Sequence, residues 1–273
     1  IFGALIALSR VVVGAHFVTD VIGGALIAIM TYKALDFFVK KKYPKTYWNN
    51  LEVYNVSPLI KIIIIFLLLA IFTTIAPEID VFVSGFFYYG NNQFLLHSNY
   101  LVSIFVRKIL LPFLLIYIFV FPVLGKFLPI QKIYFGYKFS ISELIFIWIS
   151  GGLTTLLIIN VLFKNMWGRV RPNDILPFGG NESFTPWYKI SDLCTSNCSF
   201  VSGDASVGFL LIVFYFITKK NIYLYSGLIL GSLLGLIRII AGGHFFSDII
   251  FSQIVVIISI FMFFILYKKL YDK

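Results

Sequence analysis

Six long runs of apolar residues constrain what this chain can fold into more than any other feature. The runs cover residues 58–76, 101–124, 143–163, 203–218, 222–240 and 246–267. Most approach the roughly 20 residues that a helix needs to cross the hydrocarbon core of a bilayer. Only 12% of the residues are charged, too few to solvate the surface of a soluble domain of this length. The sequence therefore predicts an all-α, polytopic membrane protein whose helices form a bundle.

Lysines concentrate in alternate segments between these runs. The groups are Lys40, Lys41, Lys42 and Lys45, then Lys126, Lys132 and Lys138, then Lys219 and Lys220, and last Lys268 and Lys269. If these segments are cytoplasmic, that side holds 14 of the 22 basic residues and only 4 of the 12 acidic ones. This positive-inside pattern explains the net charge of +10 without a nucleic-acid partner. It predicts a multi-pass protein of the inner (plasma) membrane whose opposite face is periplasmic or extracellular.

A pattern of Arg, His and Asp occurs twice, 228 residues apart. The copies are Arg10, His16 and Asp20, and Arg238, His244 and Asp248. Charged side chains are costly at membrane depth, so these matches carry more weight than matched apolar residues. We expect residues 1–45, which open inside an apolar run, to be the tail (about two helices) of a preceding related unit. Residues 46–57 would form a linker and residues 58–273 a complete six-helix domain, while the first copy alone is too short to make a complete site.

All five arginines fall on the side opposite the lysine-rich segments. They are Arg10, Arg107, Arg169, Arg171 and Arg238. Membrane topology alone does not explain this preference for arginine over lysine. The planar guanidinium group binds phosphate oxygens in pairs and stays charged, so the bias favours a phosphate site on that side.

Two polar clusters flank the longest segment on this side, residues 164–202. The first contains Lys164 and Arg171 just past an apolar run, where such residues are often interfacial anchors instead of ligands. The second, Ser202-Gly203-Asp204, leads into a helix. A hydroxyl and free backbone N–H groups at a helix N-terminus can bind an anion. The alternative is a plain N-cap, with Ser202 or Asp204 capping the helix.

The third cluster is Arg238-x5-His244-x3-Asp248. A spacing of four residues places His244 and Asp248 on one face of a helix if the helix has begun by then. A carboxylate beside an imidazole fixes its tautomer and supports the positive charge that forms when histidine acts as a nucleophile. Gly242 and Gly243 allow a close approach to the backbone. A lone histidine would more often be structural, but a combined Arg, His and Asp set in an apolar region favours chemistry.

Together the three clusters resemble the pattern K-x6-R-P, P-S-G-H and S-R-x5-H-x3-D of the type 2 phosphatidic acid phosphatase superfamily, which is related to the vanadium haloperoxidases. The resemblance covers residues 58–267 and implies a six-helix core of that kind. It also implies that His244 forms a phosphohistidine and that Asp248 orients it. By the same resemblance, the phosphate would be bound by Lys164, Arg171, Ser202, Gly203 and Arg238. No metal or other cofactor is implied, and the partners would be a phosphorylated lipid and the bilayer.

Two positions depart from that pattern. Ile237 stands where the family has Ser, although Ser9 keeps it in the first copy. Asp204 replaces the histidine that protonates the leaving oxygen. A carboxylic acid can serve as a general acid only where its surroundings favour the neutral form. The chain is therefore expected to be a lipid phosphatase, with a non-hydrolytic phospholipid-binding or transport protein of the same fold as the alternative.

Several substrates remain open at this point. They are lipid A, phosphatidic acid, phosphatidylglycerol phosphate and undecaprenyl diphosphate, as the resemblance implies. The stretch Lys-Asn-x-Trp-Gly-Arg-x-Arg-Pro leans towards members that act on lipid A. A small soluble sugar phosphate is the third reading.

Cys194 and Cys198 lie in the same long segment, in the sequence Cys-Thr-Ser-Asn-Cys. An even number of cysteines outside the cytoplasm favours a disulfide, and two unpaired thiols are the alternative. Two cysteines without a nearby histidine fall short of a zinc site.

Overall fold

The computed structural model describes residues 57–96, 101–128 and 136–271. These residues belong to one compact unit, Ser57–Lys273. The expected unit 1–45, with Arg10, His16 and Asp20, lies outside the described residues, as does nearly all of the expected linker. Those expectations therefore remain predictions.

Helices make up most of the described chain. In chain order they are α4 (Ser57–Ile75), α5 (Ile79–Gly85), α6 (Leu101–Phe105), the π-helical η1 (Val106–Leu110), α7 (Leu111–Phe119), α8 (Phe121–Phe127), α9 (Ile141–Gly152), the π-helical η3 (Leu153–Phe163), α10 (Lys164–Met166), the 3-10 turns η4 (Pro172–Asp174) and η5 (Leu176–Phe178), α11 (Gly203–Phe209), the 3-10 turn η6 (Leu210–Ile212), α12 (Val213–Thr218), α13 (Asn221–Ile240) and α14 (Phe246–Tyr271). The short strands β1 (Tyr88–Gly90) and β2 (Gln93–Phe94) form an antiparallel hairpin.

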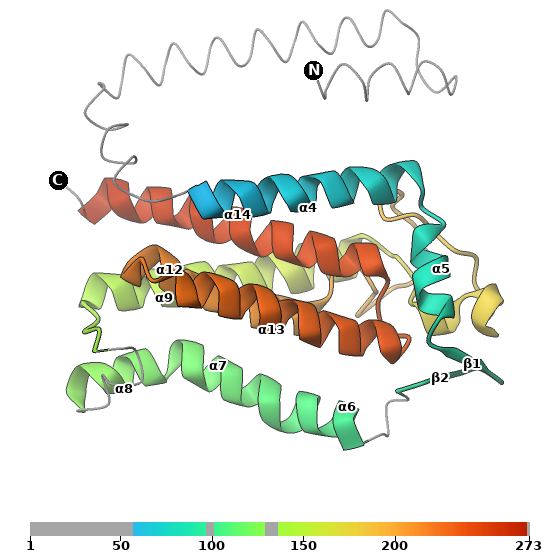
Figure 1. Ribbon diagram of the computed structural model, residues 1–273, viewed down its shortest axis with the longest axis horizontal. Coiled ribbons are helices and arrows are strands. Elements are labelled where there is room, and N and C mark those ends of the chain that lie inside the picture. Colours follow the sequence, from blue (N-terminus) through green and yellow to red (C-terminus); the bar gives the residue numbers. More distant parts are fainter. Residues whose placement is uncertain (1–56, 97–100, 129–135, 272–273) are drawn as a thin grey trace, which may run out of the picture. The chain divides into compact units, whose positions relative to one another are not determined.

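Several of these elements join end to end into longer helices, so the predicted all-α bundle is confirmed. Within the described residues, five helices are long and apolar enough to cross a membrane: Pro58–Ile75, Leu101–Phe119, Ile141–Met166, Asn221–Ile240 and Phe246–Tyr271. In Figure 1 they run side by side along the long axis of the view, with α4 beside α14 and α6 to α8 along the opposite edge. Each coincides with a predicted span to within a few residues.

The sixth predicted span, Gly203–Thr218, is a shorter apolar helix. Nearly all of its side chains are buried, so its neighbours cover it on every side. It packs most closely on α13, where Gly208 lies against Gly231: a Cβ atom on Gly208 would come 2.6 Å from the Gly231 Cα atom. The lack of side chains at this crossing lets the two backbones approach, as is common between helices in membranes.

The outer helices expose large apolar side chains. Ile64 and Ile65 of α4 are 51% and 53% exposed, and Leu156 of η3 is 69% exposed. Water does not solvate such a surface favourably, whereas lipid chains do. The helix surfaces are therefore suited to a bilayer, and the polar residues that remain buried need internal partners.

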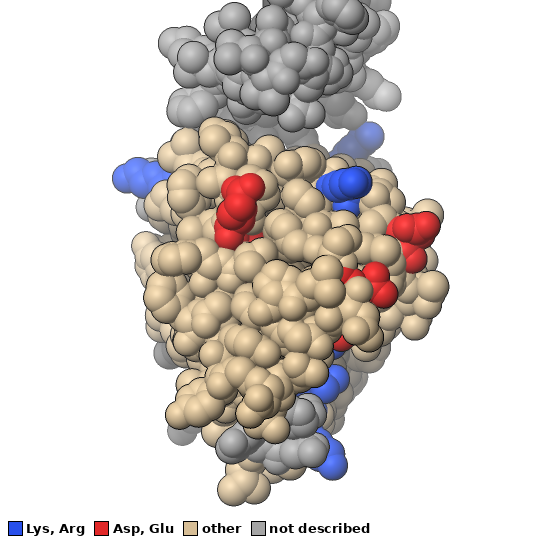
Figure 2. All heavy atoms as spheres, turned by 90° about the vertical axis from the view of Figure 1, so that its right-hand side faces the viewer, with Lys and Arg blue, Asp and Glu red and all other residues tan. Residues whose placement is uncertain are grey.

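Two chain segments, 76–96 and 167–202, lie at one end of the bundle, which we call the loop end. The first contains α5 and the hairpin, which the sequence did not predict, at the right of Figure 1. Phe94 from β2 packs with Val170, Ile175, Phe178 and Phe245 in a small apolar core under the loops. This core fixes the two segments against the turn that joins α13 to α14. Figure 2 shows the loop end from outside, where most of the described surface consists of uncharged residues.

Candidate active site

His244 lies in the short turn between α13 and α14 at the loop end. Gly242 in this turn has φ of +66° and packs against the Phe94 ring, so a side chain there would be strained and would overlap that ring. The Asn173 backbone N–H donates to the Gly242 carbonyl oxygen at 3.1 Å. His244 itself is only 2% exposed. The turn is thus fixed by contacts on both sides, and it holds the imidazole in one place.

Burial determines the protonation state of His244. It lowers the pKa of His244 from 6.5 to about 4, and the positive charges of Arg238 and Lys164 act in the same direction, while Asp248 opposes them. The imidazole is therefore neutral near pH 7, with a lone pair on one ring nitrogen. Its Nδ1 atom lies 3.5 Å from Asp248 Oδ2, without a formed hydrogen bond. This arrangement directs Nδ1 towards the carboxylate and leaves Nε2 as the nitrogen available for chemistry.

Asp248 accepts several strong hydrogen bonds. Its Oδ2 atom accepts from Ser199 Oγ at 2.5 Å and from the Phe245 backbone N–H at 2.8 Å. Its Oδ1 atom accepts from Arg169 Nη1 at 2.5 Å. Both oxygens are therefore committed to protein donors, and the carboxylate next to His244 cannot rotate freely.

Arg169 connects Asp248 to a second carboxylate, Asp80 of α5. The Arg169 guanidinium is fully buried and donates from Nη2 to Asp80 Oδ2 at 2.7 Å. It also donates from Nε to the Thr185 carbonyl oxygen at 2.9 Å and from Nη1 to Ser247 Oγ at 2.8 Å. The guanidinium also lies over the Phe245 ring, with Arg169 Cζ 4.3 Å from the ring centroid. One side chain thus joins α5, the segment after α10 and the start of α14.

The charges in this buried group depend on one another. Burial opposes the charge of Arg169, yet Asp248 and Asp80 raise its pKa above the ordinary value. Burial raises the pKa of Asp80, the Arg169 charge lowers it, and Asp248 raises it further. Buried charges are tolerated only when they are paired and hydrogen-bonded, so removing either partner leaves the other without compensation.

Lys164 and Arg171 meet at the Asn197 residue of the long loop. Lys164 Nζ donates to Asn197 Oδ1 at 3.2 Å, and Arg171 Nη2 donates to the Asn197 carbonyl oxygen at 2.7 Å. A Cβ atom on Gly203 would lie 3.3 Å from Lys164 Nζ, so the start of α11 adjoins the same ammonium group. The first and second sequence clusters are therefore brought together.

Arg238 of α13 joins the cation cluster from the other side. A Cβ atom on Gly243 would overlap the Arg238 guanidinium, so this glycine gives the arginine its space beneath the His244 turn. Arg238 Nε lies 3.4 Å from Asp204 Oδ2. Asp204, the residue that departs from the family pattern, thus forms an ion pair with one of the expected phosphate ligands.

Ser202 is the N-cap of α11, as the alternative interpretation predicted. Its Oγ atom accepts from the Ala205 backbone N–H at 3.5 Å, and the residue is fully buried. Its carbonyl oxygen accepts from Ser206 Oγ and Ser252 Oγ, at 2.7 and 3.0 Å. The cap uses the Ala205 N–H and not the N–H groups of Gly203 and Asp204, so capping does not by itself conflict with an anion at this helix end.

Arg107, on η1, is a further cation of this cluster. Burial lowers the pKa of Arg171, the Arg107 charge lowers it further, and Asp174 and Asp204 oppose this. The sequence analysis grouped Arg107 with the other arginines but gave it no role. It also missed Asp80 and gave Arg169 no partner. The available signal for Asp80 was its position between Ile79 and Val81, since a charged side chain among apolar residues needs a partner.

Cys194 and Cys198 are joined by a disulfide, with their Cα atoms 5.7 Å apart. The disulfide closes the loop that presents Asn197 to Lys164 and Arg171. In the described part of the chain, no three His, Cys, Asp or Glu side chains gather closely enough to hold a metal ion.

Comparison with known proteins gave consistent matches. The model of the PAP2 superfamily matches residues 1–44 and 145–273. A lipid A 4'-phosphatase from Francisella tularensis subsp. novicida is 35% identical over 210 residues, which is 74% of this chain and 91% of that protein. A lipid A 4'-phosphatase from Rhizobium leguminosarum is 36% identical over 97 residues, 34% of this chain and 42% of that protein. Another, from Rhizobium etli, is 36% identical over 96 residues, 34% of this chain and 37% of its own length. No solved structure matches significantly.

The buried Asp80–Arg169 pair gives the first prediction. Asp80→Asn keeps the shape of the side chain but leaves Arg169 with a single carboxylate, so we expect the free energy of unfolding to fall by about 3 kcal/mol. Thermal unfolding in detergent measures this loss. Glu78→Gln is the matched control, because Glu78 is exposed beside the same helix and should unfold like the wild type. Equal midpoints for the two variants would contradict a structural role for Asp80.

The burial of His244 gives the second prediction. Its imidazole should titrate near pH 4, observed by NMR of protein labelled with ¹⁵N-histidine in detergent and assigned by His244→Gln. Since the unfolded chain takes up this proton near pH 6.5, stability should decline as the pH falls from about 6.5 towards 4. A titration midpoint close to 6.5 would show that the imidazole is not buried as described.

Proposed function

The chain belongs to the PAP2 superfamily, and from that premise we propose that it is an integral membrane phosphatase that hydrolyses a phosphate group of a lipid-linked substrate. One observation carries the proposal. Lys164 and Arg171 from one part of the chain, and Arg238 and His244 from another, meet at the loop end beside the Gly203 end of α11. Three cations beside a neutral imidazole suit a phosphate group and a nucleophile that attacks it.

In the proposed reaction, His244 Nε2 attacks the phosphorus atom. A nitrogen–phosphorus bond forms as the bond from phosphorus to the lipid oxygen breaks, which yields a phosphohistidine. Asp248, whose carboxylate faces Nδ1, supports the positive charge that develops on the ring. Water then attacks the phosphohistidine, releases inorganic phosphate and regenerates neutral His244. No residue in this sequence of steps needs a metal ion.

The cation cluster stabilises the charge that gathers on the phosphate oxygens. Lys164, Arg171 and Arg238 are already held by the protein, so little reorganisation is needed when the transition state forms. Gly203 contributes a backbone N–H at the start of α11, and Ser202 maintains that helix end. Of the three cations, Arg238 has an acidic partner at close range, Asp204.

Asp204 is the proposed proton donor for the leaving oxygen. In the free protein its Oδ2 atom lies 3.4 Å from Arg238 Nε. A bound phosphate would compete with Asp204 for Arg238, and this would release the carboxyl group to act on the leaving oxygen. The released lipid alcohol takes this proton, and the water of the second step returns one.

Lipid A is the substrate that we propose. The support is the function named for the three relatives, together with the Lys-Asn-x-Trp-Gly-Arg-x-Arg-Pro stretch. The acyl chains would stay in the bilayer against the exposed apolar helices, while the phosphate reaches the cations at the loop end. The lysine distribution supports a periplasmic or extracellular location for this end.

A non-hydrolytic role remains the second candidate, and Asp204 is the observation that favours it. If Asp204 stays paired with Arg238 and does not act on the leaving oxygen, the site would bind phospholipid without cleaving it. The two candidates differ in whether the wild-type protein releases phosphate.

The proposed nucleophile gives the third prediction. Purified wild-type protein should release phosphate from lipid A with EDTA present, and His244→Ala should lower the rate by at least about 10³-fold. With ³²P-labelled substrate, an acid-labile and base-stable label should appear on the wild-type chain and not on the variant. His16→Ala is the matched control and should label normally. Phosphate release by His244→Ala at the wild-type rate would refute the mechanism.

The role of Asp204 gives the fourth prediction. If Asp204 protonates the leaving oxygen, Asp204→Asn should slow hydrolysis of an alkyl phosphate by about 10²-fold or more. It should affect p-nitrophenyl phosphate much less, because that leaving group needs no proton. Asp192→Asn, on the same long loop, is the control. An equal loss on both substrates would contradict an acid role, and activity gained only in Asp204→His would favour the non-hydrolytic candidate.

A further inference from the structure

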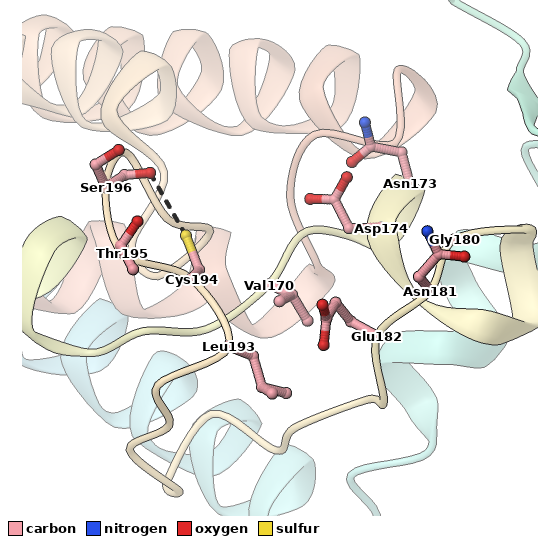
Figure 3. Close-up of a pocket in the computed structure, with 10 residues that line it drawn as sticks. All are labelled: Val170, Asn173, Asp174, Gly180, Asn181, Glu182, Leu193, Cys194, Thr195 and Ser196. Atoms are coloured by element: carbon pink, nitrogen blue, oxygen red, sulfur yellow. Dashed lines mark hydrogen bonds between the residues drawn. The ribbon is translucent and has the colours of Figure 1, made fainter.

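A polar pocket of about 440 Å³ lies in the long loop at the loop end. Asp174 and Glu182 contribute carboxylates to its lining, Asn173 and Asn181 contribute amides, and Val170 and Leu193 contribute apolar surface. Figure 3 shows Glu182 facing Val170 in the middle of this space, with Asp174 directed into it. The volume is within the range of about 300–1,000 Å³ that is usual for small-molecule sites.

Four polar side chains of this pocket make no hydrogen bond within the described part of the protein. In the part of the chain that the structure describes, the carboxylates of Asp174 and Glu182 and the amides of Asn173 and Asn181 make no side-chain hydrogen bond. Their backbones are nevertheless firmly held: the Glu182 N–H donates to the Asp174 carbonyl oxygen at 2.9 Å, and the Leu176 N–H donates to the Glu182 carbonyl oxygen at 2.8 Å. The hydrogen-bonded backbone therefore holds these carboxylate and amide side chains in the lining of one cavity, where they can bind a ligand.

The pocket is built from the same chain segments as the proposed phosphate site. Val170 in its lining precedes Arg171, whose guanidinium is within electrostatic reach of Asp174. On the opposite wall, Thr195 and Ser196 precede Asn197, which accepts hydrogen bonds from both Lys164 and Arg171. The Asn173 N–H donates to Gly242, two residues before His244. The pocket and the cations are therefore held by adjacent residues of the long loop, which places the pocket next to the proposed phosphate site.

We propose that this pocket binds the saccharide ring that carries the phosphate, so that the protein selects phosphate on a sugar over phosphate on glycerol. The inference rests on the proposed function. Sugar hydroxyl groups donate to carboxylates and exchange hydrogen bonds with amides, which are the groups that line the pocket.

The chemistry of the lining excludes other parts of a phospholipid from this pocket. An acyl chain would leave the carboxylates of Asp174 and Glu182 unsatisfied, which is costly. A second phosphate would face two like charges and is disfavoured. A hydroxyl-rich ring meets both carboxylates with donors, and its apolar C–H faces can rest on Val170 and Leu193.

The test compares two lipids and one isosteric variant, Glu182→Gln. The variant removes the charge of the acceptor, so kcat/KM for lipid A should fall about tenfold. For phosphatidic acid, which has no sugar, the fall should be less than about twofold. Glu78→Gln makes the same chemical change outside the pocket and should leave kcat/KM unchanged for both lipids.

The same comparison is repeated as binding in the His244→Ala background, where no turnover occurs. The affinity for lipid A should fall about tenfold with Glu182→Gln, and the affinity for phosphatidic acid should change by less than about twofold. Equal losses for both lipids, or no loss for lipid A, would overturn the saccharide assignment. If the wild type hydrolyses neither lipid, the proposed function fails, and the binding comparison still decides the pocket.

Discussion

The buried guanidinium of Arg169 is the interaction on which the rest of the site depends. It is held between Asp80 and Asp248 and is also bonded to Ser247 and Thr185. Each of these charges would be expensive to bury alone, and only the complete set compensates the cost. Since the partners come from α5, the long loop and α14, the pairing fixes three segments at once. The position of Asp248, and through it that of His244, follows from this arrangement.

The loop end contains two separate groups of charged residues: one has more carboxylates than cations, and the other has more cations than carboxylates. Around Arg169, two carboxylates face one cation, so this buried group has no capacity to bind a phosphate. Around the start of α11 lie Lys164, Arg171 and Arg238, of which Arg238 pairs with Asp204 at 3.4 Å, and Arg107 adds a further positive charge. The surplus of positive charge is confined to the second group. An anion is therefore attracted to the side of His244 that faces these cations, while Asp248 remains paired on the other side.

The sequence was sufficient for the parts of the fold that are encoded locally. The apolar runs predicted the membrane spans. The spacing of charged residues predicted a site formed by Lys164, Arg171, Arg238 and His244, and the structure brings these residues together. Asp80 was missed because its partner Arg169 is 89 residues away, and no spacing rule connects them. The helix α5, the hairpin and the saccharide pocket were missed for the same reason: loop conformation depends on long-range packing, here on the small core around Phe94. For Ser202 the sequence could not distinguish a helix N-cap from an anion ligand, because both roles require the same residue types.

The loop that contains the disulfide connects the proposed chemistry to substrate choice. Cys194 and Cys198 close a ring of five residues, and Asn197 within it has φ of +49°, a conformation that asparagine tolerates better than most residues. From this position Asn197 holds Lys164 and Arg171, while its neighbours Thr195 and Ser196 form one wall of the pocket. A shift of this loop would move the cations and the pocket together. The distance between the phosphate site and the saccharide pocket is therefore fixed by one covalently closed element, which is what recognition of a phosphate attached directly to a sugar ring requires.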